Sequence, residues 1–494
     1  MPGDNPPIIA ERSAPARARR LRAVVLGAAL AAGTAAAAVY AGRDLTLSHY
    51  DARAHVMVAR RITDSLTPGW RQIGGVWLPL PHLINAPIVQ SDWSYRTGLP
   101  STAVSVGAMA TGLAVLAGYL LRRTGSMAAA VLAPTLVLLN PNVLYLQSTP
   151  MTEPLLVAFS FGALAAVDRW MREPTPLRRN LAGVLLMALM LTRYEGWCVA
   201  GALLALAAWG ARCRGARAAL ALAPYCATAV LGFLLLSWGS TGRWFIASGF
   251  FVPDNPAFGH PWDALAQVAQ GTYALGGGVV LAGGVAGLLV CVLTALRDRG
   301  DRLPLALLAA AALPWFAFVQ GHPYRVRYMV PVVVASAVLS AVAVARLPER
   351  AATVLAVAIA VLATLERPPL DARAPMVLEA QWETPFRLER ESVTRVLVAQ
   401  HDGTPILASM GSLGHYMQET SAAGLPLSTF LHEGNGHLFT AAVGAPGRHV
   451  RWVLIEERAE GGDTLSARAR ADDAYLAGFA RLAEGGGLVL FGRR

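Results

Sequence analysis

Long apolar runs separated by short polar segments occupy most of the chain up to about residue 365. Each run is close to the roughly 20 residues that a helix needs to cross a bilayer. Their approximate bounds are 23–41, 99–121, 126–146, 151–167, 181–192, 197–210, 217–237, 272–296, 303–320, 329–345 and 350–365. The pattern therefore predicts an all-α polytopic membrane domain over residues 23–365, with about 11 transmembrane helices.

Residues 366–494 lose this pattern and predict a small, soluble α/β domain. The candidate helices are 386–399 and 474–483, and the candidate buried strands are 405–409, 450–456 and 487–491. The segment from His432 to His437 contains residue types that bind metals. Its glycines oppose a helix, however, and its spacing differs from the His-Glu-x-x-His motif of zinc proteases. The sequence therefore argues against a metal site in this segment.

The composition agrees with a membrane location. Hydrophobic residues make up 55% of the chain and charged residues only 15%, with a mean hydropathy of +0.45. Soluble domains carry roughly 25% charged residues. In a soluble protein the formal net charge of +11 would suggest a nucleic-acid partner. Here the placement of the arginines gives the charge another explanation, and no nucleic acid is expected as a partner.

Arginines gather in every second connection between the apolar runs. They are Arg17, Arg19, Arg20 and Arg22, then Arg122 and Arg123, then Arg169, Arg172, Arg178 and Arg179, then Arg212, Arg214 and Arg217, then Arg297, Arg299 and Arg302, and finally Arg346 and Arg350. Cytoplasmic loops of membrane proteins carry such an excess. Residues 1–22 are therefore predicted to be cytoplasmic, the chain to cross the inner (plasma) membrane, and residues 366–494 to lie on the opposite side.

The alternate connections are longer and richer in aromatic, histidine and acidic residues. The first of them, residues 43–98, holds His49, Asp51 and His55 directly after the first apolar run. Apolar positions from Val56 onward have the spacing of an amphipathic helix, which we expect to lie on the membrane surface. An acid at this place, followed by such a helix and an aromatic stretch, is unusual for a plain connector.

In this loop the chain resembles the GT-C superfamily of integral-membrane glycosyltransferases. The likeness is strongest to the branch that holds the protein O-mannosyltransferases and the bacterial aminoarabinose transferase of lipid A. Members carry an acidic motif, often Asp-Glu, at the start of the first extracytoplasmic loop. Asp51 takes the first acidic position in this chain, while Ala52 stands where many relatives have Glu.

Three further patches carry the same resemblance. Glu153 lies in 148–154, at the mouth of the fourth run, and Arg193 and Glu195 lie in 191–196, at the mouth of the fifth. The third patch, with Pro331 after it, resembles an Arg-Tyr-x-x-Pro segment near the donor lipid phosphate in relatives. It contains His322, Tyr324, Arg325, Arg327 and Tyr328. All of these patches fall on the predicted extracytoplasmic side.

The resemblance implies an enzyme that takes a sugar from a polyprenyl-phosphate carrier. The acceptor is a protein, a glycolipid or a polysaccharide outside the membrane, and membrane lipid is a further partner. Asp51 is the candidate base in a transfer with inversion, and Glu153 is a second candidate catalytic residue. Expected substrate-binding residues are His49, His55, Arg193, Glu195, His322, Tyr324, Arg325, Arg327 and Tyr328. The cofactor is open, and a divalent cation is one candidate.

Structural roles compete with these functional ones. Arg193 and Glu195 suit a plain ion pair, and the acid at 153 also complements the dipole of a helix N-terminus. Arg325 and Arg327 suit anchors for lipid headgroups. Two other functions also stay open. A transporter or lipid flippase would place ionisable residues deep inside spans, and a non-catalytic assembly or sensor protein would use residues 366–494 as its binding module.

Overall fold

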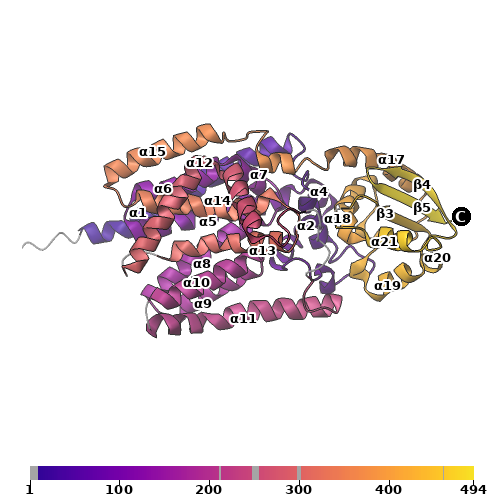
Figure 1. Ribbon diagram of the computed structural model, residues 1–494, viewed down its shortest axis with the longest axis horizontal. Coiled ribbons are helices and arrows are strands. Elements are labelled where there is room, and N and C mark those ends of the chain that lie inside the picture. Colours follow the sequence, from indigo (N-terminus) through magenta and orange to yellow (C-terminus); the bar gives the residue numbers. More distant parts are fainter. Residues whose placement is uncertain (1–8, 211–212, 247–254, 298–301, 460, 494) are drawn as a thin grey trace, which may run out of the picture.

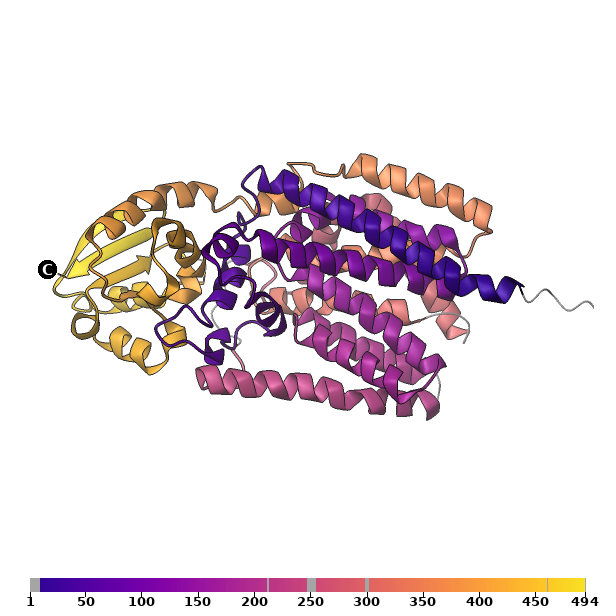
Figure 2. The same cartoon turned by 180° about the vertical axis from the view of Figure 1, so that it is seen from behind.

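The computed structural model describes residues 9–210, 213–246, 255–297, 302–459 and 461–493. A bundle of helices forms one end of the elongated molecule, and a small sheet forms the other (Figure 1). The helices of residues 43–98, the first loop on the predicted extracytoplasmic side and hence the first outer loop, lie between the two, as both views show (Figure 2). Arg212 and Arg299 of the predicted cytoplasmic connections lie outside the described residues.

Every predicted apolar run is helical. The bundle contains α1 (Ile9–Ala41), α5 (Leu99–Thr124), α6 (Met127–Leu139), α7 (Pro141–Gln147), α8 (Glu153–Arg172), α9 (Pro176–Met190), α10 (Glu195–Gly210), α11 (Cys213–Thr241), α12 (Pro261–Leu296), the 3-10 helix η2 (Leu303–Ala311), α13 (Ala312–Val319), the 3-10 helix η3 (Val326–Met329), α14 (Val330–Val344) and α15 (Glu349–Glu366).

The number of spans is lower than expected by strict criteria. Over the residues that the structure describes, six helices are long and apolar enough to cross a membrane, or seven if the bent pair of α6 and α7 is one span. The chain is thus a multi-pass membrane protein, but the count of about 11 is not confirmed. Part of the difference comes from α10 and the η2–α13 segment, which are apolar but shorter.

The break between α6 and α7 follows from local chemistry. The two helices meet at 73°, with Asn140 and Pro141 at the corner. The side-chain oxygen of Asn140 accepts hydrogen bonds from the backbone N–H groups of Asn142 and Val143, which caps α7. Pro141 has no N–H with which to continue α6, so a new helix begins where the cap is available.

The first outer loop folds into short helices: α2 (Tyr50–Arg60), the 3-10 helix η1 (Trp70–Ile73), α3 (Leu80–Asn85) and α4 (Asp92–Thr97). The helix expected after Asp51 exists, but it does not lie on a membrane surface. Every residue of α2 from Asp51 to Ala59 is buried. Val56 and Met57 share one core with Leu413 and Met417 of α18 (Met410–Glu419). Consecutive apolar positions need cover on more than one face, and the C-terminal region supplies it.

The C-terminal region is an α/β domain with a five-stranded sheet in the order β2-β1-β3-β5-β4. The strands are β1 (Ile406–Ala408), β2 (Phe430–Leu431), β3 (Trp452–Glu456), β4 (Phe479–Gly485) and β5 (Leu488–Arg493). The first three are parallel, and β3, β5 and β4 are antiparallel, with Leu454 opposite Leu490. The other helices are α16 (Pro375–Glu379), α17 (Thr384–Gln400), α19 (His437–Gly444), α20 (Pro446–His449) and α21 (Thr464–Ala471).

These elements confirm the helix over 386–399 and all three predicted strands. The predicted helix over 474–483 is wrong, because residues from Phe479 onward form β4. Glycines at 485–487 close a hairpin in which β4 pairs with β5. Tertiary pairing thus overrides the helical propensity of the alanine and leucine residues there.

The segment from His432 to His437 joins the domain to the first outer loop. The side chain of Asn435 donates to the Thr67 hydroxyl at 2.9 Å, and Gln72 donates to the Gly434 carbonyl at 2.8 Å. The His432 ring caps the following turn by accepting from the Gly434 N–H. Together with the shared core, these bonds fix the sheet domain against the loop.

The helices α12 and α14 approach each other closely. A Cβ built on Gly287 would lie 1.9 Å from the carbonyl oxygen of Leu339, a backbone atom that cannot swing away. Small residues allow such close approach between membrane helices. The glycine is therefore a packing requirement at this crossing.

We expect Gly287→Ala to lower the free energy of unfolding by about 1–3 kcal/mol, because the added methyl group overpacks the crossing. The measurement is thermal unfolding of the detergent-solubilised protein, followed by tryptophan fluorescence. Gly232→Ala in α11 is the matched control, since its Cβ would meet nothing within 4 Å. Equal unfolding temperatures for the two variants would contradict this packing.

Candidate active site

Five buried or nearly buried charged side chains form a continuous cluster where the bundle meets the first outer loop. Arg327 of η3 pairs with Asp51 of α2, and its other terminal nitrogen lies 4.0 Å from Glu153 of α8. Arg193 lies 3.0 Å from Glu153 and 2.7 Å from Glu195, the first residue of α10. Four segments that are far apart in the sequence thus meet in one ionic chain.

The local structure explains how these side chains are placed. The His49 ring accepts a hydrogen bond from the Asp51 N–H and so caps α2. Glu153 and Glu195 each occupy the first turn of a helix, where a carboxylate complements the helix dipole. The Arg193 guanidinium also donates to the Thr152 hydroxyl at 2.9 Å. These residues therefore have the structural roles that the sequence also suggested, and those roles bring their charges together.

Glu153 is the least satisfied member of the cluster. It is 1% exposed, yet neither carboxylate oxygen makes a well-aligned hydrogen bond within the described part of the chain. One of these oxygens lies 3.0 Å from a terminal nitrogen of Arg193, as an ion pair without the alignment of a hydrogen bond. A buried carboxylate without such bonds pays a desolvation penalty, and its oxygens can accept hydrogen bonds from a bound hydroxyl or amine.

The charges hold Asp51 ionised. Burial alone would raise the pKa of its carboxyl group, but Arg327 and then His49 outweigh burial and lower the pKa from 3.8 to about 2. Such a group contributes stability above about pH 4 and loses it as the pH falls toward 2. While Arg327 is its partner, Asp51 is therefore a very weak base. For Arg193, burial lowers the pKa, but the nearby Glu153 and Glu195 carboxylates raise it overall.

His49 links the cluster to a residue that the sequence did not single out. Its Nε2 atom lies 3.7 Å from one oxygen of Glu379 in α16, and the other oxygen accepts from the Val326 N–H at 2.7 Å. Burial raises the pKa of Glu379, and the contact with His49 and the other groups around it lower it overall. Glu379 lies in the region expected to form the soluble domain, so no motif pointed to it.

Arg325 and Arg327 do not share one environment. The Arg325 guanidinium lies over the rings of Tyr50 and Trp382, at 5.6 Å from each centroid. Such cation–π contacts are made by the flat face of the guanidinium. Arg327 instead faces the carboxylates and lies 5.1 Å from the Tyr328 ring. Trp382 also comes from the C-terminal region and was not predicted.

Of the other candidates in this patch, His322 lies near the ionic cluster and Tyr324 does not. The His322 ring meets Tyr328 edge-on at 5.5 Å, which places it beside Arg327. Burial lowers the pKa of His322. Tyr324 packs against Phe318 at 5.6 Å, is 40% exposed, and lies outside the ionic cluster.

His55 lies one helical turn after Asp51 on α2, next to a second residue that was not predicted. Its Nδ1 atom is 3.1 Å from Nε2 of His82 in α3, and the Trp77 ring covers it at 4.4 Å. His82 is spaced 27 positions from His55 in the sequence. Only the fold of the outer loop brings the two rings together.

The described residues contain no group of three or more His, Cys, Asp or Glu side chains arranged to hold a metal ion. The acids of the cluster face arginines instead. The open expectation of a divalent cation therefore finds no ligand set among these residues.

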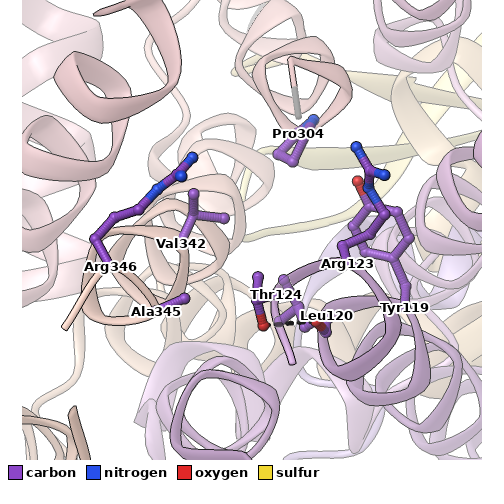
Figure 3. Close-up of a pocket in the computed structure, with 8 residues that line it drawn as sticks. All are labelled: Tyr119, Leu120, Arg123, Thr124, Pro304, Val342, Ala345 and Arg346. Atoms are coloured by element: carbon purple, nitrogen blue, oxygen red, sulfur yellow. Dashed lines mark hydrogen bonds between the residues drawn. The ribbon is translucent and has the colours of Figure 1, made fainter. Parts of the chain in front are cut away.

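A cavity of about 300 Å³ lies at the opposite end of the bundle, between the ends of α5 and α14 and the start of η2, with Arg123 and Arg346 on opposite sides of it (Figure 3). α5 has 26 residues and is therefore about 39 Å long at 1.5 Å per residue. The cavity lies at the end of this helix that is far from the loop carrying Asp51, so it is not part of the candidate site.

Comparison with solved structures identifies the fold. Two crystal structures of ArnT from Cupriavidus metallidurans, one bound to undecaprenyl phosphate and one in the apo state, each match with a TM-score of 0.53 and 15% sequence identity. The match covers 93% of this chain and 97% and 96% of the two ArnT chains. No protein-family model and no curated protein matches the chain. The expected likeness to the aminoarabinose transferase of lipid A is confirmed at the level of the fold.

The Asp51–Arg327 pair should show strong energetic coupling. We expect Asp51→Asn alone to lower the free energy of unfolding by about 3–5 kcal/mol, because it leaves a buried guanidinium without its main partner. Combined with Arg327→Gln, the total loss should fall short of the sum of the single losses by about 1–3 kcal/mol. Chemical denaturation of the purified protein measures all three variants.

The matched control is the Asp371–Arg373 pair, whose atoms are 3.9 Å apart and whose arginine is 91% exposed. Its double-mutant cycle should show almost no coupling. Additive losses at Asp51 and Arg327 would mean that the buried pair does not exist in the folded protein.

Proposed function

We propose that this protein is a membrane glycosyltransferase that moves a sugar from a polyprenyl-phosphate donor to an extracytoplasmic acceptor. The observation that carries the proposal is the convergence of Asp51, Glu153, Arg193 and Arg327 in one buried cluster at the end of a GT-C-like bundle. The shared fold with ArnT, which was crystallised with undecaprenyl phosphate, supports it. The sugar is a hexose or a pentose, and the acceptor is a protein, a glycolipid or a polysaccharide.

In this proposal the donor phosphate binds to Arg327, with Arg325 as a second cation beside it. Guanidinium groups form strong, charge-assisted hydrogen bonds to phosphate. They also stabilise the negative charge that develops on the phosphate oxygen as it leaves the sugar. The leaving group is the polyprenyl phosphate itself.

Donor binding also activates the base. Once the phosphate engages Arg327, Asp51 keeps the effect of burial but loses part of its neutralising partner, so its pKa rises. The acceptor oxygen or nitrogen attacks the anomeric carbon while Asp51 takes its proton. The bond from that carbon to the phosphate oxygen breaks on the opposite side, and its electron pair stays with the phosphate. The products are an inverted glycoside and polyprenyl phosphate.

Glu153 and Arg193 have a positioning role in this scheme. The Glu153 carboxylate accepts a hydrogen bond from a hydroxyl of the sugar or the acceptor, and Arg193 holds Glu153 and Glu195 in place. The arginine pattern supports the accompanying topology. The N-terminus is cytoplasmic, and the cluster and residues 366–494 are on the outer side of the inner membrane.

Asp51→Asn should reduce transfer by about 10²–10⁴-fold, the usual contribution of a general base. The assay supplies undecaprenyl-phosphate carriers that bear a labelled pentose or hexose and follows the label into an acceptor in native membranes. Asp371→Asn serves as the control, because that carboxylate forms its ion pair with the exposed Arg373 and not with a member of the cluster. Lipid movement across the bilayer without any covalent product would instead support the transporter alternative.

The same substitution should have the opposite effect on binding. Asp51 and the donor phosphate compete for Arg327, so Asp51→Asn should tighten the binding of undecaprenyl phosphate. Arg327→Gln should weaken it by about 10–100-fold, the value of a charged hydrogen bond. Tryptophan fluorescence titration measures both, with Arg373→Gln as the control. If Asp51→Asn and Arg327→Gln weaken binding alike, the competition does not operate.

A further inference from the structure

The hydrogen bonds of His55 and His82, beside the ionic cluster, run in one defined direction. His82 places its Nδ1 atom 3.2 Å from the carbonyl oxygen of Leu78. A carbonyl oxygen can only accept a hydrogen bond, so Nδ1 of His82 carries a proton. Burial lowers the pKa of His82 to about 3, which keeps the ring neutral. Its Nε2 atom therefore has a lone pair and no proton.

The protonation of His82 determines which nitrogen of His55 carries a proton. Because Nε2 of His82 can only accept, the 3.1 Å contact requires Nδ1 of His55 to donate. Burial also lowers the pKa of His55 well below its usual value, so this ring is neutral too. Its second nitrogen, Nε2, is left with a lone pair. The chain from the Leu78 carbonyl thus selects one tautomer for both rings.

That lone pair has no partner in the described part of the chain. Nε2 of His55 makes no hydrogen bond there and, unlike Nε2 of His49 and of His432, is not sealed from solvent. His55 as a whole is 7% exposed, so only a small part of the residue is accessible. Residues four apart lie on the same face of a helix, which directs His55 toward the side of α2 that carries Asp51.

We infer that Nε2 of His55 accepts a hydrogen bond from a hydroxyl or amine of the substrate bound at the Asp51–Arg327 cluster, and that His82 is the positioning residue that fixes this acceptor. The inference rests on the proposed transfer reaction. A low proton affinity makes His55 a poor base but leaves it a good neutral acceptor. A substrate without an O–H or N–H group at that point leaves the lone pair unpaired and is disfavoured.

Nitrogen NMR of ¹⁵N-histidine-labelled protein tests the tautomers without any turnover. His55 and His82 should both carry the proton on Nδ1, with signals assigned by their loss in His55→Phe and His82→Phe. A proton on Nε2 of either ring would overturn the inference. This result does not depend on whether the protein transfers a sugar, so it separates failure of the inference from failure of the proposed function.

Steady-state kinetics tests the ligand. With the carrier and acceptor that support turnover, His55→Phe should raise the KM of one of them by about tenfold and change kcat less. His82→Phe should raise the same KM by a similar factor. His82→Gln should recover most of the loss, because an amide can donate to Leu78 and accept from His55 at once. The exposed residue His437 supplies the matched control, His437→Phe.

Monodeoxy forms of the carrier sugar identify the source of the hydrogen bond. If one deoxy sugar is about tenfold poorer for the wild type but not for His55→Phe, the donor group is on the sugar. If every deoxy sugar affects the two proteins equally while His55→Phe raises the KM of the acceptor, the group is on the acceptor. Unchanged KM values for both substrates in His55→Phe would overturn the inference.

Discussion

The rest of the candidate site depends on the buried ion pair between Asp51 and Arg327. Removing two charges from water is costly, and a single close contact rarely compensates for it. Here the pair is extended by Glu153, Arg193 and Glu195. The extension joins α2 of the outer loop to three separate parts of the bundle. The same contacts that offset burial therefore also set the position of the loop over the membrane helices.

The C-terminal domain completes this arrangement from the other side. It shares a hydrophobic core with α2 and α4, and α16 contacts both α7 and η3 of the bundle. Glu379 and Trp382 reach the cluster from this region. The domain thus helps to hold the loop and adds side chains to its edge, which gives a physical reason for its presence in a membrane protein of this fold.

The sequence alone predicted those features that follow from the local order of residues. Hydropathy located the membrane helices, and the motif resemblance selected Asp51, Glu153, Arg193, Glu195 and Arg327, which the fold brings together. It could not select His82, Glu379 or Trp382, because each acts through a partner that only tertiary packing supplies. It also misplaced α2 on the membrane surface, since the pattern of α2 shows an apolar face but not what covers it. The helix predicted over 474–483 failed for a similar reason, as strand pairing decides that segment.

The ionic cluster also imposes an order on the reaction proposed for it. One guanidinium cannot neutralise Asp51 and a donor phosphate equally well at the same time. Without donor, Asp51 is held ionised and has little affinity for a proton, so an acceptor that arrives first meets an inactive base. With donor bound, the same carboxylate is buried and short of positive charge, which is the state in which it removes a proton. In the proposed reaction the active base is therefore assembled only when the sugar to be transferred is already in place.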